Sequence, residues 1–166
     1  PASRYTNKNM KYKLLFLICF LAVSSFAADS AKQSILQFRL VVEKPTADSE
    51  KALLSETMPN GKKAVVEFQV LKTPLLDGSS VKAAVVSTES GRVDILITLT
   101  DEGKTLFAKI TREHIDQRLA IFIDGKLYEV PVIKMEIPSG TMQITGSFSK
   151  QEAEELAKKI NDAVAK

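Results

Sequence analysis

Residues 118–148 read RLAIFIDGKLYEVPVIKMEIPSGTMQITGSF, and this stretch decides the predicted fold. The apolar side chains of Leu119, Ile121 and Ile123 recur at every second position, which is the period of a β-strand. Asp124-Gly125 then provides the residue pair that a two-residue hairpin turn prefers, because such turns need a left-handed backbone. The stretch is therefore expected to begin with a hairpin.

Two more strands, separated by a turn, are expected in the same stretch. The chain returns from Lys126 to Ile133. Because Pro131 has no amide donor, this strand is expected at a sheet edge or bent at the proline. Pro138-Ser139-Gly140 predicts the next turn, and a third strand follows from Met142 to Phe148.

Capping residues predict a helix on each side of these strands. Thr100 is the expected N-cap of a helix over residues 101–115. Ser149 and Glu152 form an S-x-x-E capping box, which predicts a second helix over residues 150–164. The apolar residues expected to face the sheet are Leu106, Phe107 and Ile110 in the first helix, and Ala153, Leu156, Ala157, Ile160 and Val164 in the second.

Further strands are expected upstream, over residues 35–42, 63–71, 81–88 and 92–100. In the first of them, Gln37 and Arg39 point away from the face that carries the apolar residues. Residues 43–61 are expected to form a polar insertion with a helical turn at residues 50–54. The whole pattern predicts an α+β fold, a two-layer sandwich with a mostly antiparallel sheet and two helices packed on it.

The first 27 residues contain, in order, the basic, apolar and small-residue parts of a secretory signal. We expect the true start at Met10, with residues 1–9 upstream of it, and cleavage after Ala27. The alternative is an uncleaved membrane anchor, although the apolar run from Leu14 to Ala28 is shorter than the roughly 20 residues that span a bilayer. Cys19, the only cysteine, lies in this run, so the exported protein is expected to have no cysteine.

Composition and motifs argue against nucleic-acid binding and against catalysis. Residues 1–27 hold four of the 23 basic residues and none of the 20 acidic ones, so 19 basic and 20 acidic residues remain, a net charge of −1. Asp101-Glu102 is interpreted as a favourable acidic first turn of a helix, and His114, the only histidine, lacks the spaced partners of a metal site. We therefore expect no catalytic residue, no cofactor site and no metal site, and predict that the chain is not an enzyme.

Residues 100–133, TDEGKTLFAKITREHIDQRLAIFIDGKLYEVPVI, and residues 144–157, ITGSFSKQEAEELA, closely resemble one part of a known family. That part is the head of the first periplasmic domain of SecD and SecDF, membrane subunits that assist bacterial protein export. The matching positions are Thr100, Gly103, Phe107, Thr111, Arg118 to Ile121, Asp124, Gly125, Pro131 to Ile133, Ile137, Gly140, Ile144 to Gly146, Phe148, Glu152, Ala153, Leu156 and Ala157. Upstream, residues 70–86 look like the segment that enters the head, and Leu36–Val41 looks like a strand of the adjoining base.

The resemblance implies three parts: upstream residues and signal peptide over 1–27, base-like strands with the polar insertion over 35–72, and a SecD-like head over 73–166. It implies a periplasmic or other extracytoplasmic domain that binds unfolded or extended polypeptide, the Sec translocon or another envelope protein. Membrane contact is expected only through an uncleaved signal. Because the family's membrane helices have no counterpart here, no proton-driven motor activity is expected. The alternative is a small exported module with the same fold and an unrelated regulatory or enzymatic function.

Two sets of residues are predicted to carry this function. The edge strand can accept an extended chain by strand addition, because its outer backbone groups are unpaired; the alternative is an ordinary edge protected by charged side chains. The residues of this candidate polypeptide-binding edge are Tyr128, Val130 and Pro131. A candidate hinge between the base-like and head-like parts consists of Lys72, Thr73 and Pro74.

Overall fold

The computed structural model describes residues 34–57, 61–89 and 91–165. These residues belong to one structural unit. The predicted export signal, with its start at Met10 and cleavage after Ala27, lies outside the described residues. Neither helix in the described part of the chain has the length and apolar character needed to cross a membrane.

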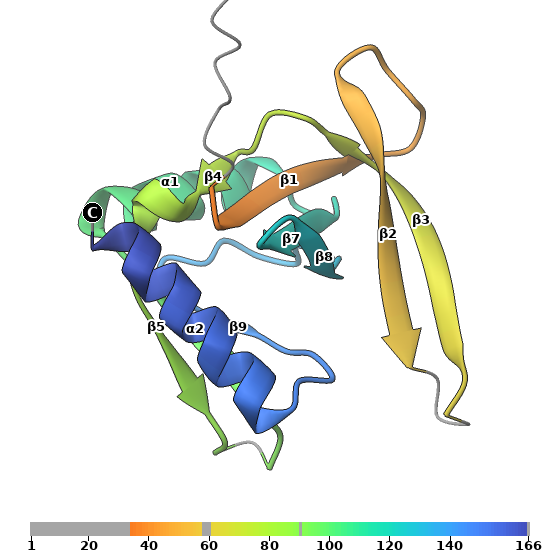
Figure 1. The fold of residues 1–166 in the computed structure, drawn as a ribbon. Helices are drawn as coiled ribbons and strands as arrows, with labels where there is room; N and C mark the ends of the chain where they lie inside the picture. The colour runs from red at the N-terminus through yellow and green to blue at the C-terminus, as the bar shows by residue number, and fades with distance from the viewer. Residues whose placement is uncertain (1–33, 58–60, 90, 166) are drawn as a thin grey trace, which may run out of the picture. The chain divides into compact units, whose positions relative to one another are not determined.

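The described chain consists mainly of strands, with one α-helix after β6 and a second after β9 (Figure 1). Its elements are β1 (Leu36–Val42), β2 (Ser49–Thr57), β3 (Lys63–Leu71), β4 (Leu76–Asp77), the 3-10 helix η1 (Gly78–Ser80), β5 (Val81–Ser87), β6 (Asp94–Leu99), α1 (Asp101–Glu113), β7 (Leu119–Ile123), β8 (Lys126–Glu129), β9 (Thr141–Ile144) and α2 (Lys150–Val164). The predicted α+β class, with mostly antiparallel strands and two helices, is confirmed.

The strands divide between two antiparallel sheets. The larger sheet has the order β2-β3-β1-β7-β8, with β4 also paired to β1, and the smaller has the order β5-β6-β9. The three strands predicted within residues 118–148 form, although the second ends at Glu129 and not at Ile133, and the third ends at Ile144 and not at Phe148. They do not share a sheet, because β9 pairs with β6. This pairing sets Ile144 opposite Ile95, and both side chains are fully buried. Burial of apolar side chains therefore favours β6 as the partner of β9.

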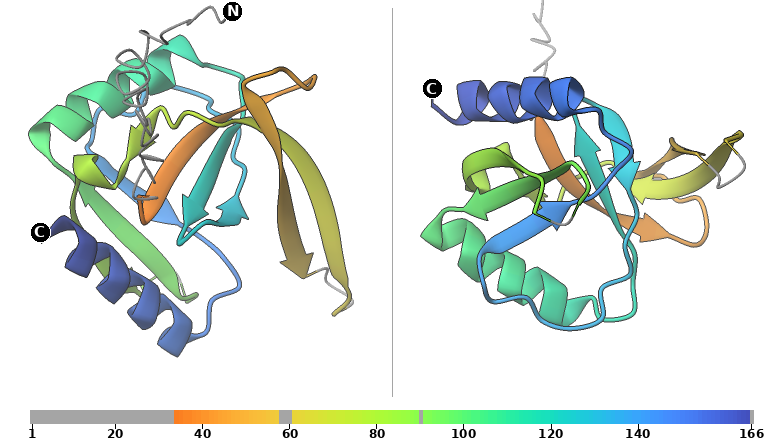
Figure 2. Two further views of the ribbon diagram at one scale, coloured as in Figure 1. Left: turned by 45° about the horizontal axis from the view of Figure 1, so that its top comes forward. Right: turned by 90° about the horizontal axis from the view of Figure 1, so that it is seen from below.

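The helical turn predicted at residues 50–54 is wrong, because these residues lie in β2. That strand pairs along its whole length with β3, and the resulting hairpin projects beyond the other strands in both views of Figure 2. Ala52 and Leu54 are buried, whereas Leu53 between them is 58% exposed, which is the alternation of a strand. Residues 50–54 include good helix formers, but strand pairing and burial in the tertiary structure override this local preference.

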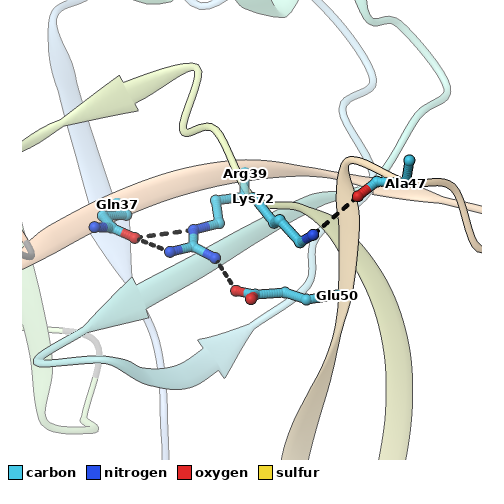
Figure 3. A network of polar contacts seen from close by, with 5 residues as sticks. All are labelled: Gln37, Arg39, Ala47, Glu50 and Lys72. Carbon is cyan, nitrogen blue, oxygen red and sulfur yellow. Dashed lines mark hydrogen bonds and ion pairs between the residues drawn. The ribbon is translucent and has the colours of Figure 1, made fainter. Parts of the chain in front are cut away.

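Two apolar cores hold the unit together. The larger core is formed by β1, one face of β7, the β5-β6-β9 sheet and both helices. The smaller core lies between the β2–β3 hairpin, the other face of β7 and β8. Gln37 and Arg39 do point to the opposite side of β1 from Phe38, but there they are buried beneath the hairpin, at 7% exposure each. The guanidinium of Arg39 donates to the side-chain oxygen of Gln37 and forms an ion pair with Glu50 (Figure 3). This network ties β1 to β2.

Both helices begin as their caps predict. The hydroxyl of Thr100 accepts the N–H of Gly103 at 3.0 Å, and the hydroxyl of Ser149 accepts the N–H of Glu152 at 3.2 Å. The predicted stripe of α2 is confirmed, with the first four of its residues buried and Val164 packed at the margin. The stripe predicted for α1 is wrong at Leu106, which is 40% exposed. The buried residues of α1 are Gly103, Phe107, Ile110 and Thr111.

Candidate functional site

An open cleft of about 1020 Å³ lies beside the edge strands of both sheets. Its walls include β8 with the segment that follows it, residues 126–135. They also include residues 141–143 of β9 and residues 145–148 after it. Residues 54–56 near the end of β2 also contribute. The three residues of the predicted polypeptide-binding edge, Tyr128, Val130 and Pro131, all line this cleft.

The segment that follows β8 has backbone groups that point away from β7. The N–H of Leu119 donates to the carbonyl of Pro131 at 2.9 Å, and Arg118 lies opposite Val132 in an isolated antiparallel bridge. Backbone groups alternate in direction along an antiparallel strand, so the N–H and C=O of Val130 and Val132 point away from β7. The donor that Pro131 lacks would have faced β7. As predicted, the proline lies at the edge of the sheet. The outward-facing N–H groups of Val130 and Val132, on either side of it, are present.

On one side of the smaller sheet, a side chain of α2 occupies the free edge. The side-chain oxygen of Asn161 accepts the N–H of Ala84 in β5 at 2.8 Å, and its side-chain N–H donates to the carbonyl of Ala84 at 2.8 Å. An asparagine side chain therefore takes the place of a neighbouring strand at this position. Such covering of an edge prevents pairing with other chains.

The other edge of this sheet, β9, is partly occupied by side chains as well. Leu99 donates to the carbonyl of Gly140 at 2.9 Å, so alternation turns the backbone groups of Thr141 and Thr145 away from β6. The hydroxyl of Ser139 donates to the carbonyl of Thr141 at 3.1 Å and accepts its N–H at 3.4 Å. The carboxylate of Glu129 accepts the hydroxyl of Thr145. This last contact joins the two walls of the cleft.

Tyr128 is held in place by aromatic and charged neighbours. Its ring centroid lies 5.3 Å from that of Phe148, and the ammonium of Lys126 lies 4.6 Å from the Tyr128 ring centroid. Burial raises the pKa of the Tyr128 hydroxyl, and the negative charges of Glu152 and Asp124 raise it further. The tyrosine is thus a fixed, neutral part of the cleft wall.

Polar residues from three elements meet at the Glu129 end of the cleft. Asp94 in β6 is fully buried and accepts the side-chain N–H of Gln143 in β9 at 2.6 Å. Burial raises the pKa of Glu129; the charge of Asp94 adds to the rise, whereas the hydrogen bond from the Thr145 hydroxyl and the charge of Arg92 oppose it. The sequence analysis did not predict this cluster. The signal that could have indicated it is Asp94, an acidic residue directly before the apolar run of β6.

The candidate hinge lies where the chain leaves the β2–β3 hairpin, and its first residue is anchored there. The N–H of Lys72 donates to the carbonyl of Asp48 at 2.9 Å, and its ammonium donates to the carbonyl of Ala47 at 2.9 Å (Figure 3). Thr73 and Pro74 follow as a bend that leads into β4. The hinge remains a prediction, as does the division of the chain at residue 72.

Asp101, Glu102 and His114, which the sequence analysis weighed as catalytic or metal-binding candidates, lie at the two ends of α1. Asp101 and Glu102 lie in the first turn of α1, and a ring nitrogen of His114 lies 3.2 Å from the side-chain oxygen of Gln117. Across residues 34–57, 61–89 and 91–165, no three or more His, Cys, Asp or Glu side chains are grouped so that they could hold a metal ion.

Comparison with known proteins identifies a family that matches most of the described chain. The family model for the SecDF P1 head subdomain matches residues 52–163. The protein translocase subunit SecDF of Thermus thermophilus is 35% identical over 134 residues, which is 76% of this chain and 18% of that protein. The subunit SecD of Aquifex aeolicus is 34% identical over 153 residues, 89% of this chain and 30% of that protein. The SecD subunit of Sebaldella termitidis is 45% identical over 84 residues, 50% of this chain and 21% of that protein.

Solved structures agree with the sequence comparison. The structure described as that of "a membrane component SecDF that enhances protein export" matches with a TM-score of 0.59 and 27% identity, covering 77% of this chain and 62% of that one. SecDF in its "Super-membrane-facing form" matches with a TM-score of 0.60 and 28% identity, covering 77% of this chain and 18% of that one. This chain spans less than a third of the length of the three curated relatives. The resemblance read from residues 100–157 is confirmed, and the chain belongs to the family of the SecDF P1 head subdomain.

Proposed function

We propose that this chain acts outside the cytoplasm as a polypeptide-binding domain of the protein-export machinery. Its client is an unfolded or extended polypeptide, which lies in the cleft beside β8 and adds a strand to the outer edge at Val130 and Val132. It works beside the Sec translocon or another envelope protein, without being an enzyme and without driving transport by itself. Its membership of the SecDF head family supports the place in export.

The observation that carries the proposal is the direction of the backbone at the edge after β8. The N–H and C=O of Val132 point away from β7. Within the described part of the chain, neither Val130 nor Val132 donates its N–H to another group. In the smaller sheet, by contrast, side chains bind the outward-facing backbone of Ala84 on one edge and of Thr141 on the other. An edge with free donors beside a long cleft is where strand addition is expected.

Apolar side chains near this edge fit clients of varied sequence. Val132 is 36% exposed and Met135 is 68% exposed, and both line the cleft. Methionine is flexible and adapts its shape to different apolar partners. Because strand addition uses the client's backbone, binding is expected to be weak and largely independent of client sequence.

The test uses fluorescence anisotropy with a fluorescein-labelled peptide that has no stable fold. The described domain should bind this peptide, and Val132→Pro should weaken binding about tenfold, the equivalent of about 1.4 kcal/mol. The proline removes an outward donor that β7 does not use. A peptide methylated at alternate backbone nitrogens should bind as weakly to the unaltered domain as the unmethylated peptide binds to the proline variant.

The matched control is a second exposed valine outside the cleft. Val85 in β5 is 52% exposed and does not line the cleft, so Val85→Glu should leave peptide binding unchanged while Val132→Glu weakens it. Equal loss in both variants would count against the edge as the binding site. If the domain does not bind any unfolded peptide at high micromolar concentration and instead binds one folded envelope protein, the client-binding proposal is wrong.

A further inference from the structure

We propose that Glu129 and Thr145 are positioning residues of the cleft: the hydrogen bond between their side chains holds residues 145–147, here called the wall segment, where they contact a bound client. This inference rests on the proposed polypeptide-binding function and adds two residues to its site. The wall segment follows β9 on the way to α2, and each of its three residues lines the cleft.

Buried residues fix both ends of the wall segment but not the segment itself. Ile144 before it is fully buried, and Phe148 after it is 9% exposed. Between them, Thr145 is half-buried, whereas Gly146 and Ser147 are exposed. Glycine also gives the backbone more freedom than any other residue. The position of these three residues therefore depends on what holds Thr145.

The carboxylate of Glu129 holds Thr145 from the other sheet. Glu129 is the last residue of β8, and its carboxylate accepts the Thr145 hydroxyl. A hydrogen bond to an ionised group is stronger than one between neutral groups. Within residues 34–57, 61–89 and 91–165, no backbone–backbone hydrogen bond joins the wall segment to β8. The side-chain bond can thus open without disturbing the ladder of either sheet.

A wall held in place before binding favours affinity. Ordering a mobile segment during binding costs free energy, and a site that is already formed avoids this cost. Loss of the bond between Glu129 and Thr145 should leave the open edge at Val130 and Val132 unchanged, because those groups lie beyond β8. The loss should therefore appear mainly as faster dissociation of the client, as is usual for changes within one interface.

The main experiment measures peptide release by stopped-flow anisotropy, with an unfolded fluorescein-labelled peptide that contains no Lys or Arg. Thr145→Val keeps the size of the side chain but removes the hydroxyl, and should raise the dissociation rate constant about fivefold and the association rate constant less than about twofold. Thr145→Ser keeps a hydroxyl and should restore release to within about twofold of the parent rate. Thr105→Val is the matched control, because Thr105 is exposed in α1 and does not line the cleft.

Variants of Glu129 test whether it acts through Thr145. Glu129→Gln keeps an oxygen acceptor and should release the peptide at nearly the parent rate, whereas Glu129→Ala should match Thr145→Val. The double variant Glu129→Ala/Thr145→Val should be no weaker than either single variant, because both remove the same bond. If the carboxylate contacted the client directly, the two losses would add and Glu129→Gln would not restore binding.

A spin label on the wall segment reports its motion in the absence of a client. Cys19 is the only cysteine, so Cys19→Ser combined with Ser147→Cys places one label at an exposed position of the segment. Electron paramagnetic resonance should show a more mobile label when Thr145→Val is added, and the peptide should reduce that mobility. Thermal unfolding shows whether each variant is folded at the assay temperature. Should Thr145→Val fail to fold, Glu129→Ala and Glu129→Gln provide the comparison.

The outcomes separate this inference from the proposed function. If the parent binds peptide and Thr145→Val releases it at the parent rate, or if the label in that variant is no more mobile, the positioning role is refuted while client binding stands. If the parent binds no unfolded peptide, both the proposed function and the positioning role are refuted.

Discussion

The side chain of Asn161 in α2 makes two hydrogen bonds to the backbone of Ala84 in β5, each 2.8 Å long. A helix residue thereby completes the ladder of an edge strand. Each such bond contributes about 0.5–1.5 kcal/mol, so Asn161→Ala should lower the free energy of unfolding by about 1–3 kcal/mol. Urea denaturation measures this. Lys158→Ala, on the solvent side of the same helix, should change it by less than about 0.5 kcal/mol. An Asn161→Ala variant as stable as the parent would show that water replaces the amide without cost.

The last helix should be indispensable for stability. Leu156 is 6% exposed and belongs to the larger core, so Leu156→Ala should cost about 2–5 kcal/mol of unfolding free energy. Denaturation monitored by circular dichroism provides the measurement. A loss below about 0.5 kcal/mol would indicate that α2 is not docked in solution.

Gly103 should not tolerate a side chain, despite its position in a helix. A Cβ atom there would lie 2.4 Å from the carbonyl oxygen of Ser80, which already accepts the N–H of Thr100 at 2.9 Å. Alanine favours a helix by about 1 kcal/mol over glycine, but the forced displacement of backbone should outweigh this gain. We expect Gly103→Ala to destabilise the domain by about 1–3 kcal/mol. Its neighbour variant Lys104→Ala, on the exposed side of α1, should be nearly neutral in the same thermal scans.

The buried guanidinium of Arg39 should resist conservative replacement. It donates to Gln37, pairs with Glu50 and lies 4.9 Å from the ring centroid of Phe122. A lysine cannot reproduce this planar fork, so Arg39→Lys should cost about 1–3 kcal/mol by leaving the buried amide of Gln37 under-bonded. The exposed pair of Lys51 with Glu67 is the control, because Lys51→Met should cost less than about 1 kcal/mol. Equal losses in the two variants would contradict a special role for burial at Arg39.

Glu129 should make stability depend on pH. Its pKa in the folded domain is raised above the ordinary value of 4.5, so the folded state binds more protons than the unfolded state between these two values. The contribution of Glu129 to stability is therefore fully present below the ordinary pKa and is lost as pH rises through the folded pKa. Glu129→Gln lacks this dependence. The stability of the parent minus that of the variant should fall across this window, measured by urea denaturation at a series of pH values, and a constant difference would contradict the raised pKa.

Much of this protein follows from local sequence signals. The caps at Thr100 and Ser149, the hairpin turn at Asp124-Gly125 and the apolar stripe of α2 are all found where they were predicted. Each of these depends on interactions within a few residues, which the sequence specifies directly. The ordered matches over residues 100–157 likewise identified the family from the sequence.

Other features depend on partners that are distant in sequence. Residues 50–54 form a strand because β3 pairs with them and buries Leu54, and β9 joins β6 because Ile144 fits beside Ile95. The cleft exists only because the edges of two sheets meet, and the bond between Glu129 and Thr145 crosses from one sheet to the other. No local pattern encodes such contacts, since pairing and burial depend on which surfaces the folded chain brings together. The sequence by itself determined the fold class, the family and most of the helices and strands, because caps, turns and apolar periods are local. The tertiary structure decided that residues 50–54 form a strand, and which strand edges are covered and which remain open.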